Sequence, residues 1–342
     1  MIELHTLTDG GQTAAAIASM IGEFLTGAEK SLDIALYDFA LSEATAPLVV
    51  GALRDANARG VAVRLLYNVD HEMPIPVPPP PRTNPDLVAT YGVPVKPISG
   101  IPNLMHHKYV VRDGARVMTG SANWTDDSWT REENVIAFVD SPEVAAAYTQ
   151  DFEQLWFTLR VDGSGAFDTT EIEVEGARVT PLFCPGRAHR LAHRMAGAIG
   201  RAEIRVRVCS PVITSGPILG TLAEVAASRR VDLSGVFDET QMKEVLGQWK
   251  ANDQARWKIP AFESLVTSAP FGAKRSTPWG TDTVHDFMHA KVTVADDVVF
   301  LGSYNLSHAG EQNAENVLEI HDKGSADTLA GFIDGLRARY PR

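Results

Sequence analysis

The sequence predicts an α/β protein of two similar halves, each a mixed β-sheet flanked by helices, which together form an intramolecular pseudo-dimer. Three observations lead to this prediction. The length of 342 residues suits two domains, helix-like and strand-like segments alternate in the same order twice, and one polar motif occurs once in each repeat. With 44% hydrophobic and 22% charged residues, the composition is that of an ordinary folded protein.

The alternation is clearest at the start of each half, where an apolar helix precedes a β-rich segment and a second helix–strand pair follows. In the first half these segments cover residues 13–25, 31–39, 46–59 and 61–68. In the second half they cover residues 188–199, 203–210, 219–230 and 231–238. Because helices alternate with strands, each half is expected to be an α/β sandwich.

A β-meander and a terminal helix are predicted to end each half. The meander strands are expected at residues 105–111, 116–119 and 133–139, and again at 288–294, 298–301 and 315–320. Turn-forming residues between 161 and 177 place the boundary near residue 170. The sequence thus divides into an N-terminal half, residues 1–170, and a C-terminal half, residues 171–342.

Two insertions interrupt the repeat and are expected at the surface. One is a proline-rich stretch, residues 73–85, in which residues 78–81 are all proline, and the other is a helical stretch, residues 241–254. For the proline run, a stiff polyproline II loop without a binding role is favoured over a partner-binding motif.

Charge and composition restrict the classes of function. The formal net charge is -12, so the protein as a whole does not attract nucleic acid or anionic lipid, and any polyanion must be held locally. No apolar stretch approaches the roughly 20 residues of a bilayer span and no secretory leader is recognised, so a cytoplasmic location is expected. Cys184 and Cys209 lie in apolar strand-like segments, which indicates buried, inert thiols rather than a disulfide or a zinc site.

One polar motif occurs in both predicted meanders. It reads H-x-K-x4-D-x6-G-S-x-N in the first half and is one residue shorter, between the aspartate and the glycine, in the second. Its members are His106, Lys108, Asp113, Gly120, Ser121 and Asn123 in the first half, and His289, Lys291, Asp296, Gly302, Ser303 and Asn305 in the second. A Glu-Asn-Val tripeptide starts at Glu133 and at Glu315, after the same interval from each asparagine, so the register of the two halves is expected to be preserved.

Alternation along a strand places the histidine and the lysine of each motif on one face. His106 and Lys108 therefore point together, while His107 points to the opposite face, and His289 and Lys291 repeat the arrangement. A duplicated fold can bring both pairs together across a pseudo-twofold axis. Two imidazoles and two ammonium groups, surrounded by the serine hydroxyls and asparagine amides of the motifs, predict a site for the non-bridging oxygens of a phosphodiester.

The paired motifs resemble those of the phospholipase D superfamily, and the resemblance covers about residues 12–335. Residues 104–108 and 119–125 are most similar to the nuclease-type and mitochondrial cardiolipin-hydrolase-type branch. The resemblance implies a phosphodiesterase that uses neither a metal nor an organic cofactor. It also implies a structural role for Asp113 and Asp296, at the turns that join two strands.

The chemistry expected of such a site is covalent. One histidine attacks phosphorus to form a phosphohistidine, and the other protonates the leaving alkoxide and later takes a proton from water. The resemblance favours His106 as the nucleophile. An attacking imidazole benefits from a carboxylate at its far nitrogen, and Glu133 and Glu315 are the candidates. Whether each glutamate serves its own or the opposite half stays open, as does hydrolysis against transfer to an alcohol.

The substrate is predicted to be nucleic acid, with a phospholipid as the alternative. A nuclease agrees with the branch resemblance and with a helix whose Arg187, Arg190 and Arg194 form either a groove for a polyanion or a solvated face. Trp124 and Trp129 either stack on bases or pack in the core. A phospholipase D or cardiolipin-synthase-like enzyme would show an apolar rim. A non-catalytic nucleic-acid-binding module is disfavoured, because both motifs are intact.

Other histidines receive ordinary interpretations. His189 and His193 are spaced i,i+4 on a helix, like metal ligands, but no third ligand is evident, so no metal is expected. His285 and Asp286 are candidates for lining the entrance to the site. A monomer with an internal pseudo-twofold axis is expected, because the duplication already supplies both parts of the site.

Overall fold

The structure is a computed structural model that describes residues 1–72, 78–280 and 283–342. The strands of its first sheet are β1 (Ile2–Leu7), β2 (Ser31–Leu36), β4 (Ala62–Val69), β5 (Val95–Ser99), β6 (Lys108–Arg112), β7 (Arg116–Gly120) and β9 (Asn134–Asp140). The strands of the second sheet are β10 (Ile172–Val174), β11 (Ala177–Cys184), β12 (Arg205–Ser210), β13 (Asp232–Asp238), β14 (Phe271–Lys274), β15 (Val292–Ala295), β16 (Val298–Gly302) and β17 (Glu315–His321). Two short strands, β3 (Phe39–Ala40) and β8 (Trp124–Thr125), pair separately.

The helices follow the same division. Those of the first half are α1 (Ala14–Thr26), α2 (Ala46–Ala58), α3 (Pro85–Ala89), α4 (Asp126–Thr130) and α5 (Pro142–Thr158). Those of the second half are α6 (Ala188–Arg201), α7 (Gly216–Ser228), α8 (Glu239–Ala251), α9 (Lys258–Ser268), α10 (His308–Gln312) and α11 (Lys323–Arg339). The predicted helical insertion at residues 241–254 is α8, and a further helix, α9, follows it.

The strand order confirms that the two halves are similar. The order is β1-β9-β7-β6-β2-β4-β5 in the first sheet and β10-β11-β17-β16-β15-β12-β13-β14 in the second, so the six strands from β9 to β5 correspond to those from β17 to β14. In each sheet three neighbouring strands run parallel, β2-β4-β5 and β12-β13-β14, and the other pairs are antiparallel. Strands β1 and β10 were not expected from the sequence. Strand β10 lies in residues 161–177, which have the composition of a linker.

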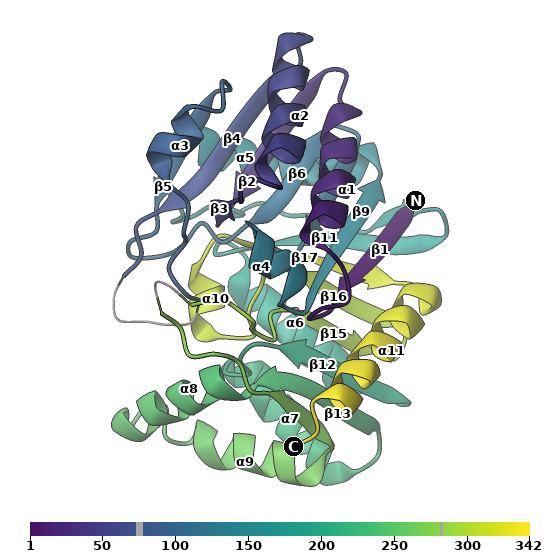
Figure 1. Cartoon of the computed structure of the whole chain (residues 1–342). Coiled ribbons are helices and arrows are strands. Elements are labelled where there is room, and N and C mark those ends of the chain that lie inside the picture. Colours follow the sequence, from purple (N-terminus) through teal and green to yellow (C-terminus); the bar gives the residue numbers. More distant parts are fainter. Residues whose placement is uncertain (73–77, 281–282) are drawn as a thin grey trace.

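Helices cover both sheets and also separate them (Figure 1). Apolar residues of α5 and α11, such as Phe152 and Ile333, pack in one cluster with residues of both sheets. A second cluster joins α1 and α2 to the outer face of the first sheet. A third joins α6, α7 and α9 to the outer face of the second. The fold is therefore a layered α/β sandwich, as predicted.

Several helices begin at residues that cap them. The side chains of Thr13, Ser141 and Asp322 each accept a hydrogen bond from the backbone N–H three residues further on, at 3.2, 3.2 and 2.6 Å. These bonds satisfy an N–H group that has no partner within the helix. The caps therefore determine where α1, α5 and α11 begin, and α5 and α11 are the two helices between the sheets.

The aspartate of each motif lies at the hairpin turn, as the resemblance implies. Asp113 and Asp296 have φ values of 58° and 54°, in the left-handed region that suits aspartate in a turn. The carboxylate of Asp113 accepts backbone N–H groups of residues 29–31, and that of Asp296 accepts those of residues 203–205. Each aspartate thus joins its hairpin to the chain that leads into the neighbouring strand, β2 or β12.

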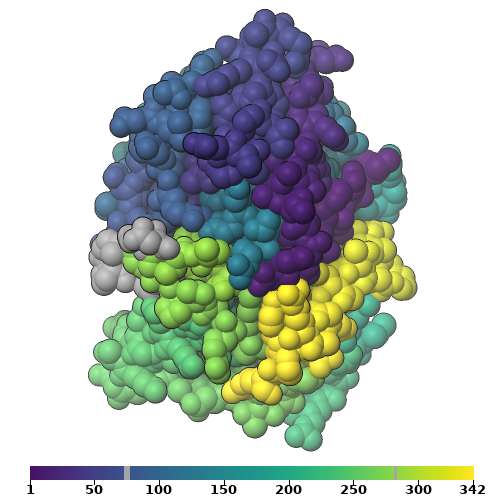
Figure 2. All heavy atoms as spheres, viewed as in Figure 1, coloured from purple at the N-terminus to yellow at the C-terminus, as the bar shows by residue number. Residues whose placement is uncertain are grey.

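The two halves contact each other next to both motifs. Short backbone bridges join Met105 to Ala314 and Met288 to Glu133, and each bridge crosses from one half to the other. At the chain ends, Arg339 donates a hydrogen bond to the carbonyl of Asp9 at 2.7 Å. Figure 2 shows this contact as purple N-terminal atoms against the yellow C-terminal helix. Within the described ranges, no helix is both long enough and apolar enough to cross a bilayer.

Candidate active site

The histidines of both motifs lie at this interface between the halves. His106 precedes β6, and its backbone N–H donates to the carbonyl of Ala314 in the other half at 2.9 Å. His289 precedes β15, and its backbone N–H donates to the carbonyl of Glu133 at 3.2 Å. The two imidazoles are 0% and 3% exposed. Backbone bonds therefore hold each histidine against the opposite half.

The electrostatics of the two imidazoles reflect a shared site. Burial lowers the pKa of His106 well below its ordinary value, and the charges of Lys108 and Lys291 lower it further. For His289 burial is again the largest cause, followed by the same two lysines. Burial lowers the pKa of both lysines as well. Each histidine is therefore affected by the lysines of both halves, and the bridges from Met105 to Ala314 and from Met288 to Glu133 place both motifs at the same interface.

His106 has a direct carboxylate partner from the opposite half. Its Nδ1 lies 2.9 Å from the carboxylate of Glu315, the first residue of β17. Glu315 is fully buried, and burial raises its pKa to about 8 although Lys108 opposes the shift. A carboxyl group with such a pKa can exchange a proton with an imidazole. Nε2 of His106 is buried and has no hydrogen-bond partner among the described residues.

The expected role of Glu133 as a histidine partner is wrong. Its carboxylate accepts hydrogen bonds from Lys274 at 2.8 Å and from Tyr340 at 2.5 Å. Nδ1 of His289 instead faces Oδ1 of Asn134 at 3.1 Å. The carboxylate of Glu132 lies 3.4 Å from the same nitrogen.

The reason is a difference in register between the two halves. Gly120 pairs with Ile136, whereas Gly302 pairs with Val317, so the first half holds one more residue between these partners. The two Glu-Asn-Val tripeptides are therefore displaced by one position in space, contrary to the expected register. Asn134 occupies the place that Glu315 has in the other half. Glu132 was missed because nothing in the sequence marks the extra residue.

The two motif serines hold the partners of the histidines. The hydroxyl of Ser121 donates to Oδ1 of Asn134 at 2.7 Å, and Ser303 forms a hydrogen bond that lowers the pKa of Glu315. Each serine oxygen also accepts a backbone N–H of β9 or β17, at 3.0 Å. The expectation that Ser121 and Ser303 bind phosphate is therefore not met in this structure, because their hydroxyls are already engaged.

The two motif asparagines remain available to a ligand. Oδ1 of Asn123 and Oδ1 of Asn305 are buried, and across the described ranges neither accepts a hydrogen bond. A buried polar group without a partner costs about 1–3 kcal/mol, so both amides are suited to contact a bound polar group. The sequence predicts that they bind phosphate together with the two lysines, whose ammonium groups donate to the backbone carbonyls of His106 and His289 in this structure.

The motif glycines permit a close approach between strands. A Cβ atom on Gly120, whose φ is +144°, would lie 2.1 Å from the carbonyl oxygen of Val135. On Gly302, with φ +158°, it would lie 2.1 Å from the carbonyl oxygen of Asn316. Only glycine allows this separation, which brings the loop after β7 or β16 against the strand that carries the histidine partner.

One wall of the site is formed by Tyr37 and the described end of the proline-rich insertion. The ring of Tyr37 lies 4.7 Å from the imidazole of His106, and its hydroxyl donates to the carbonyl of Pro79 at 2.6 Å. Arg82 forms an ion pair with Asp127 next to α4. The sequence favours a polyproline II loop without a binding role for this run, and in the structure the carbonyl of Pro79 is bonded to Tyr37 beside His106. Residues 73–77 of the insertion lie outside the described residues.

His285, a candidate for lining the site entrance, is close enough to His289 for its charge to lower the pKa of that imidazole. It is 6% exposed, and its backbone N–H donates to Asp127 at 3.0 Å. Burial, followed by the charge of Arg82, lowers the pKa of His285. Its neighbour Asp286 is bonded to Thr277, at 2.7 and 3.0 Å.

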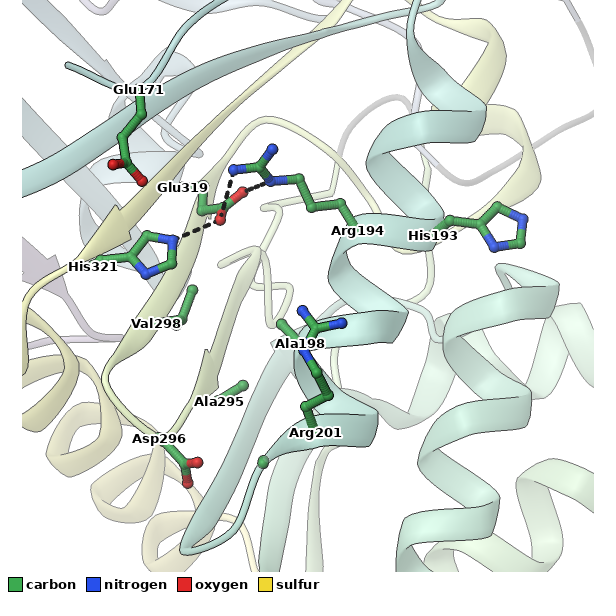
Figure 3. A pocket seen from close by; sticks show the side chains of 11 residues that line it. Glu171, His193, Arg194, Ala198, Arg201, Ala295, Asp296, Val298, Glu319 and His321 are labelled. Atoms are coloured by element: carbon green, nitrogen blue, oxygen red, sulfur yellow. Dashed lines mark hydrogen bonds and ion pairs between the residues drawn. The ribbon is translucent and has the colours of Figure 1, made fainter.

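The three arginines of the predicted groove are engaged in ion pairs. Arg187 and Arg190 both contact the carboxylate of Asp168, at 3.3 and 3.1 Å. Arg194 donates two hydrogen bonds to Glu319 of β17. Figure 3 shows this pair at a pocket of about 540 Å³, with His321 on the other side of the carboxylate. These arginines therefore do not form one free cationic row along α6.

The two tryptophans of the predicted groove are buried. Trp124 is 2% exposed and Trp129 is 0% exposed, and both pack in the outer apolar cluster of the first half. Of the two alternatives for these side chains, packing in the core is confirmed, and base stacking is wrong for this structure because neither ring is accessible.

The structure places the remaining candidate ligands as follows. The His189 and His193 rings lie 4.3 Å apart on α6. Over residues 1–72, 78–280 and 283–342, no group of three or more His, Cys, Asp or Glu side chains is arranged to hold a metal ion. Cys184 and Cys209 are buried free thiols, as predicted.

Comparison with protein families places both halves in one family. The family model described as "Cardiolipin synthase, PLD-like domain" matches residues 21–156 and 195–336, one segment in each half. Together the two segments include both motifs and both histidine partners.

Curated relatives match part of the chain. The mitochondrial cardiolipin hydrolase of Xenopus laevis is 31% identical over 144 residues, which is 42% of this chain and 62% of that protein. Phospholipase D Z of Dictyostelium discoideum is 30% identical over 151 residues, 39% of this chain and 34% of that protein. The chain thus covers less than two thirds of the length of these relatives.

A solved structure is similar over nearly the whole chain. The phosphatidylserine synthase of Haemophilus influenzae superposes with a TM-score of 0.66 and 14% sequence identity, covering 99% of this chain and 86% of that protein. At this identity the similarity concerns the fold, and it includes the arrangement of the two halves.

Proposed function

We propose that this chain, which belongs to the phospholipase D superfamily, cleaves a phosphodiester bond through a covalent phosphohistidine on His106. The observation that carries the proposal is the 2.9 Å contact between Nδ1 of His106 and the carboxylate of Glu315, since Nε2 is then the nitrogen left to attack. A carboxylate in this position stabilises the positive charge that the imidazole gains when it bonds to phosphorus.

The proposed first step forms the bond between Nε2 of His106 and phosphorus and breaks the bond from phosphorus to the leaving oxygen. His289 donates the proton that this oxygen takes up. Lys108 and Lys291 stabilise the negative charge of the non-bridging oxygens in the transition state. In the second step His289 takes the proton of a water or alcohol molecule, whose oxygen displaces His106 from phosphorus.

For the substrate we favour a phospholipid. The contacts expected for a nucleic-acid groove are engaged elsewhere, because Arg194 is paired with Glu319 and both Trp124 and Trp129 are buried. The names of the curated relatives, cardiolipin hydrolase and phospholipase D, support the same class of substrate. Nucleic acid, the substrate that the sequence predicts, is the second candidate.

One observation favours that second candidate. Arg187 and Arg190 share a single carboxylate, that of Asp168, so one positive charge at the start of α6 is uncompensated within this group. A phosphate backbone would be attracted by that charge.

The test incubates the purified protein, in EDTA, with cardiolipin in detergent micelles and in parallel with labelled single-stranded and duplex oligonucleotides. His106→Ala is the inactive variant. His308→Ala is its matched control, because this histidine side chain is 72% exposed. Glycerol in a second set of reactions separates hydrolysis from transfer.

Release of phosphatidic acid that is lost in His106→Ala and retained in His308→Ala is the expected result. Cleavage of the oligonucleotides alone would assign nucleic acid as the substrate. If the wild-type protein leaves every one of these diesters intact, the proposed function is wrong.

A further inference from the structure

Each half contributes a glutamate and an asparagine, two positions apart at the start of β9 or β17, to the region behind a histidine. In the first half Nδ2 of Asn134 donates to the carboxylate of Glu132 at 3.1 Å. In the second half Nδ2 of Asn313 donates to the carboxylate of Glu315 at 3.4 Å. Because Glu133 bridges to Met288 as Ala314 bridges to Met105, Glu132 is equivalent to Asn313, and Asn134 is equivalent to Glu315. The carboxylate and the amide have therefore exchanged places between the halves.

The exchange gives the two histidines different partners. His106 contacts a carboxylate directly, at 2.9 Å. His289 contacts the amide oxygen of Asn134 at 3.1 Å, with the carboxylate of Glu132 further away at 3.4 Å. A neutral amide stabilises an imidazolium less than a carboxylate does, so the two imidazoles differ in proton affinity.

The orientation of the Asn134 amide is determined by its surroundings. Its nitrogen donates to the carbonyl and to the hydroxyl of Ser128, at 2.9 and 3.1 Å, and to Glu132. Its oxygen accepts the hydroxyl of Ser121 at 2.7 Å and faces His289. Because an amide oxygen can only accept, Nδ1 of His289 carries the proton and Nε2 faces the substrate side.

We infer that Glu132 is a positioning residue for His289, which acts through Asn134 and by its charge at 3.4 Å to set the proton affinity of this imidazole. The inference rests on the proposed function, in which His289 transfers protons and His106 carries the phosphoryl group. In the described part of the chain, protonated His289 has no carboxylate in direct contact to stabilise its positive charge. It therefore releases its proton more readily to the leaving oxygen. The exchange of amide and carboxylate thus suits His289 to proton transfer and His106 to bond formation.

The charged groups that face His289 make a nearby anion necessary. Lys291, Lys108 and His285 lower its pKa in addition to burial, and His106 lies across the centre. Glu132 is 2% exposed, and burial followed by Asp127 raises its pKa, while Lys291 opposes the shift. A protonated His289 ring 3.4 Å away opposes the shift further, so the carboxylate is ionised when the imidazole carries its positive charge. Without the charge of Glu132, a protonated His289 would be close to two ammonium groups and to no carboxylate at comparable distance.

The test measures the titration of the His289 ring by NMR in protein labelled with ¹⁵N-histidine, and assigns its signals with a His289→Ala sample. Glu132→Gln removes the charge and keeps the shape. It is expected to shift the His289 titration to lower pH by about one pH unit, the size of effect that one charge within 4–6 Å produces. The basic limb of the pH–rate profile is expected to move in the same direction.

Glu133→Gln is the matched control. It makes the same chemical change at the next residue, whose carboxylate contacts Lys274 and Tyr340 instead of His289. This variant is expected to lower the free energy of unfolding and to leave the His289 titration where it is in the wild-type protein.

A double variant tests the inference from the opposite direction. Glu132→Asn combined with Asn134→Glu reproduces the order of the second half, and the His289 titration is expected to move to higher pH. If the His289 ring titrates at the same pH in the single variant, the double variant and Glu133→Gln, Glu132 has only a structural role and the inference is wrong. The NMR titration requires no substrate, so it decides this question even if the proposed catalytic function fails its own test.

Discussion

Nδ1 of His106 and the carboxylate of Glu315 lie 2.9 Å apart, although 209 positions separate the two residues along the chain. Both side chains are fully buried where the two halves meet. One half supplies the imidazole and the other supplies its partner, so the reactive pair depends on the docking of the two sheets.

Replacing Glu315 with glutamine is expected to lower kcat by roughly 100-fold or more, because an amide stabilises the positively charged intermediate less than a carboxylate does. The pKa of about 8 for Glu315 also predicts that wild-type kcat/KM rises as the pH increases through this value, since the deprotonated carboxyl is the active form. Steady-state rates against pH measure both effects. A Glu315→Gln variant with the kcat of the wild-type protein and the same increase of kcat/KM with pH would contradict this role of Glu315.

Replacing His289 with alanine is expected to leave the phosphoryl group on His106 when the substrate carries a good leaving group such as 4-nitrophenolate. Departure of that group needs no proton, whereas the attack of water on the intermediate still needs a base. Mass spectrometry of protein quenched at alkaline pH locates the adduct. His106→Ala serves as the control and is expected to give none, while an adduct on any other residue would exclude His106 as the nucleophile.

Replacing Asp113 with asparagine is expected to lower the free energy of unfolding by about 1–2 kcal/mol at pH 7, through weaker bonds to backbone N–H groups. Burial raises the pKa of Asp113, but these hydrogen bonds outweigh burial and hold the pKa below its ordinary value of 3.8. Ionised Asp113 therefore stabilises the folded state at pH values above its unfolded pKa. This stabilisation is lost as the pH falls through the lower pKa that Asp113 has in the folded state.

Denaturant unfolding of wild type and Asp113→Asn at pH 7 and at about pH 3 checks this dependence, and the difference between the two proteins should narrow at the lower pH. Asp253→Asn is a suitable control, because this side chain is 86% exposed. A difference that is equal at both pH values would show that the carboxylate charge of Asp113 is not responsible.

Replacing Gly120 with alanine is expected to destabilise the protein by about 3 kcal/mol, because the new Cβ would lie 2.1 Å from the carbonyl oxygen of Val135. Gly220, inside α7, has nothing within 4 Å of the corresponding position. Alanine there is expected to stabilise the protein by about 0.5–1 kcal/mol. Thermal unfolding of both variants measures the contrast, and a Gly120→Ala protein as stable as Gly220→Ala would disprove the close approach.

The sequence was sufficient for the features that depend on local pattern. The alternation of side chains along a strand correctly predicts that His107 points away from His106, and its ring lies 3.1 Å from Asp151 in the interior. The turn positions of Asp113 and Asp296 also follow from the motif and the resemblance.

The features that were wrong depend on distant contacts. The identical tripeptides at Glu133 and Glu315 suggested equal roles, but one additional residue before β9 moves Asn134 into the position next to His289. Trp129 is a large apolar side chain next to a motif, and only tertiary packing determines that it is buried. The partner of Arg194 is Glu319, which lies 125 positions away.

The exchanged Glu–Asn pairs have a consequence for the ancestry of the chain. A homodimer built from two copies of one half must give both imidazoles the same neighbour, either two amides or two carboxylates, because its axis is a true symmetry element. Joining two copies in one polypeptide removes that constraint, since each copy can then accumulate its own substitutions. Asn134 and Glu315 are such a difference, and with them the two imidazoles of one centre have unlike neighbours.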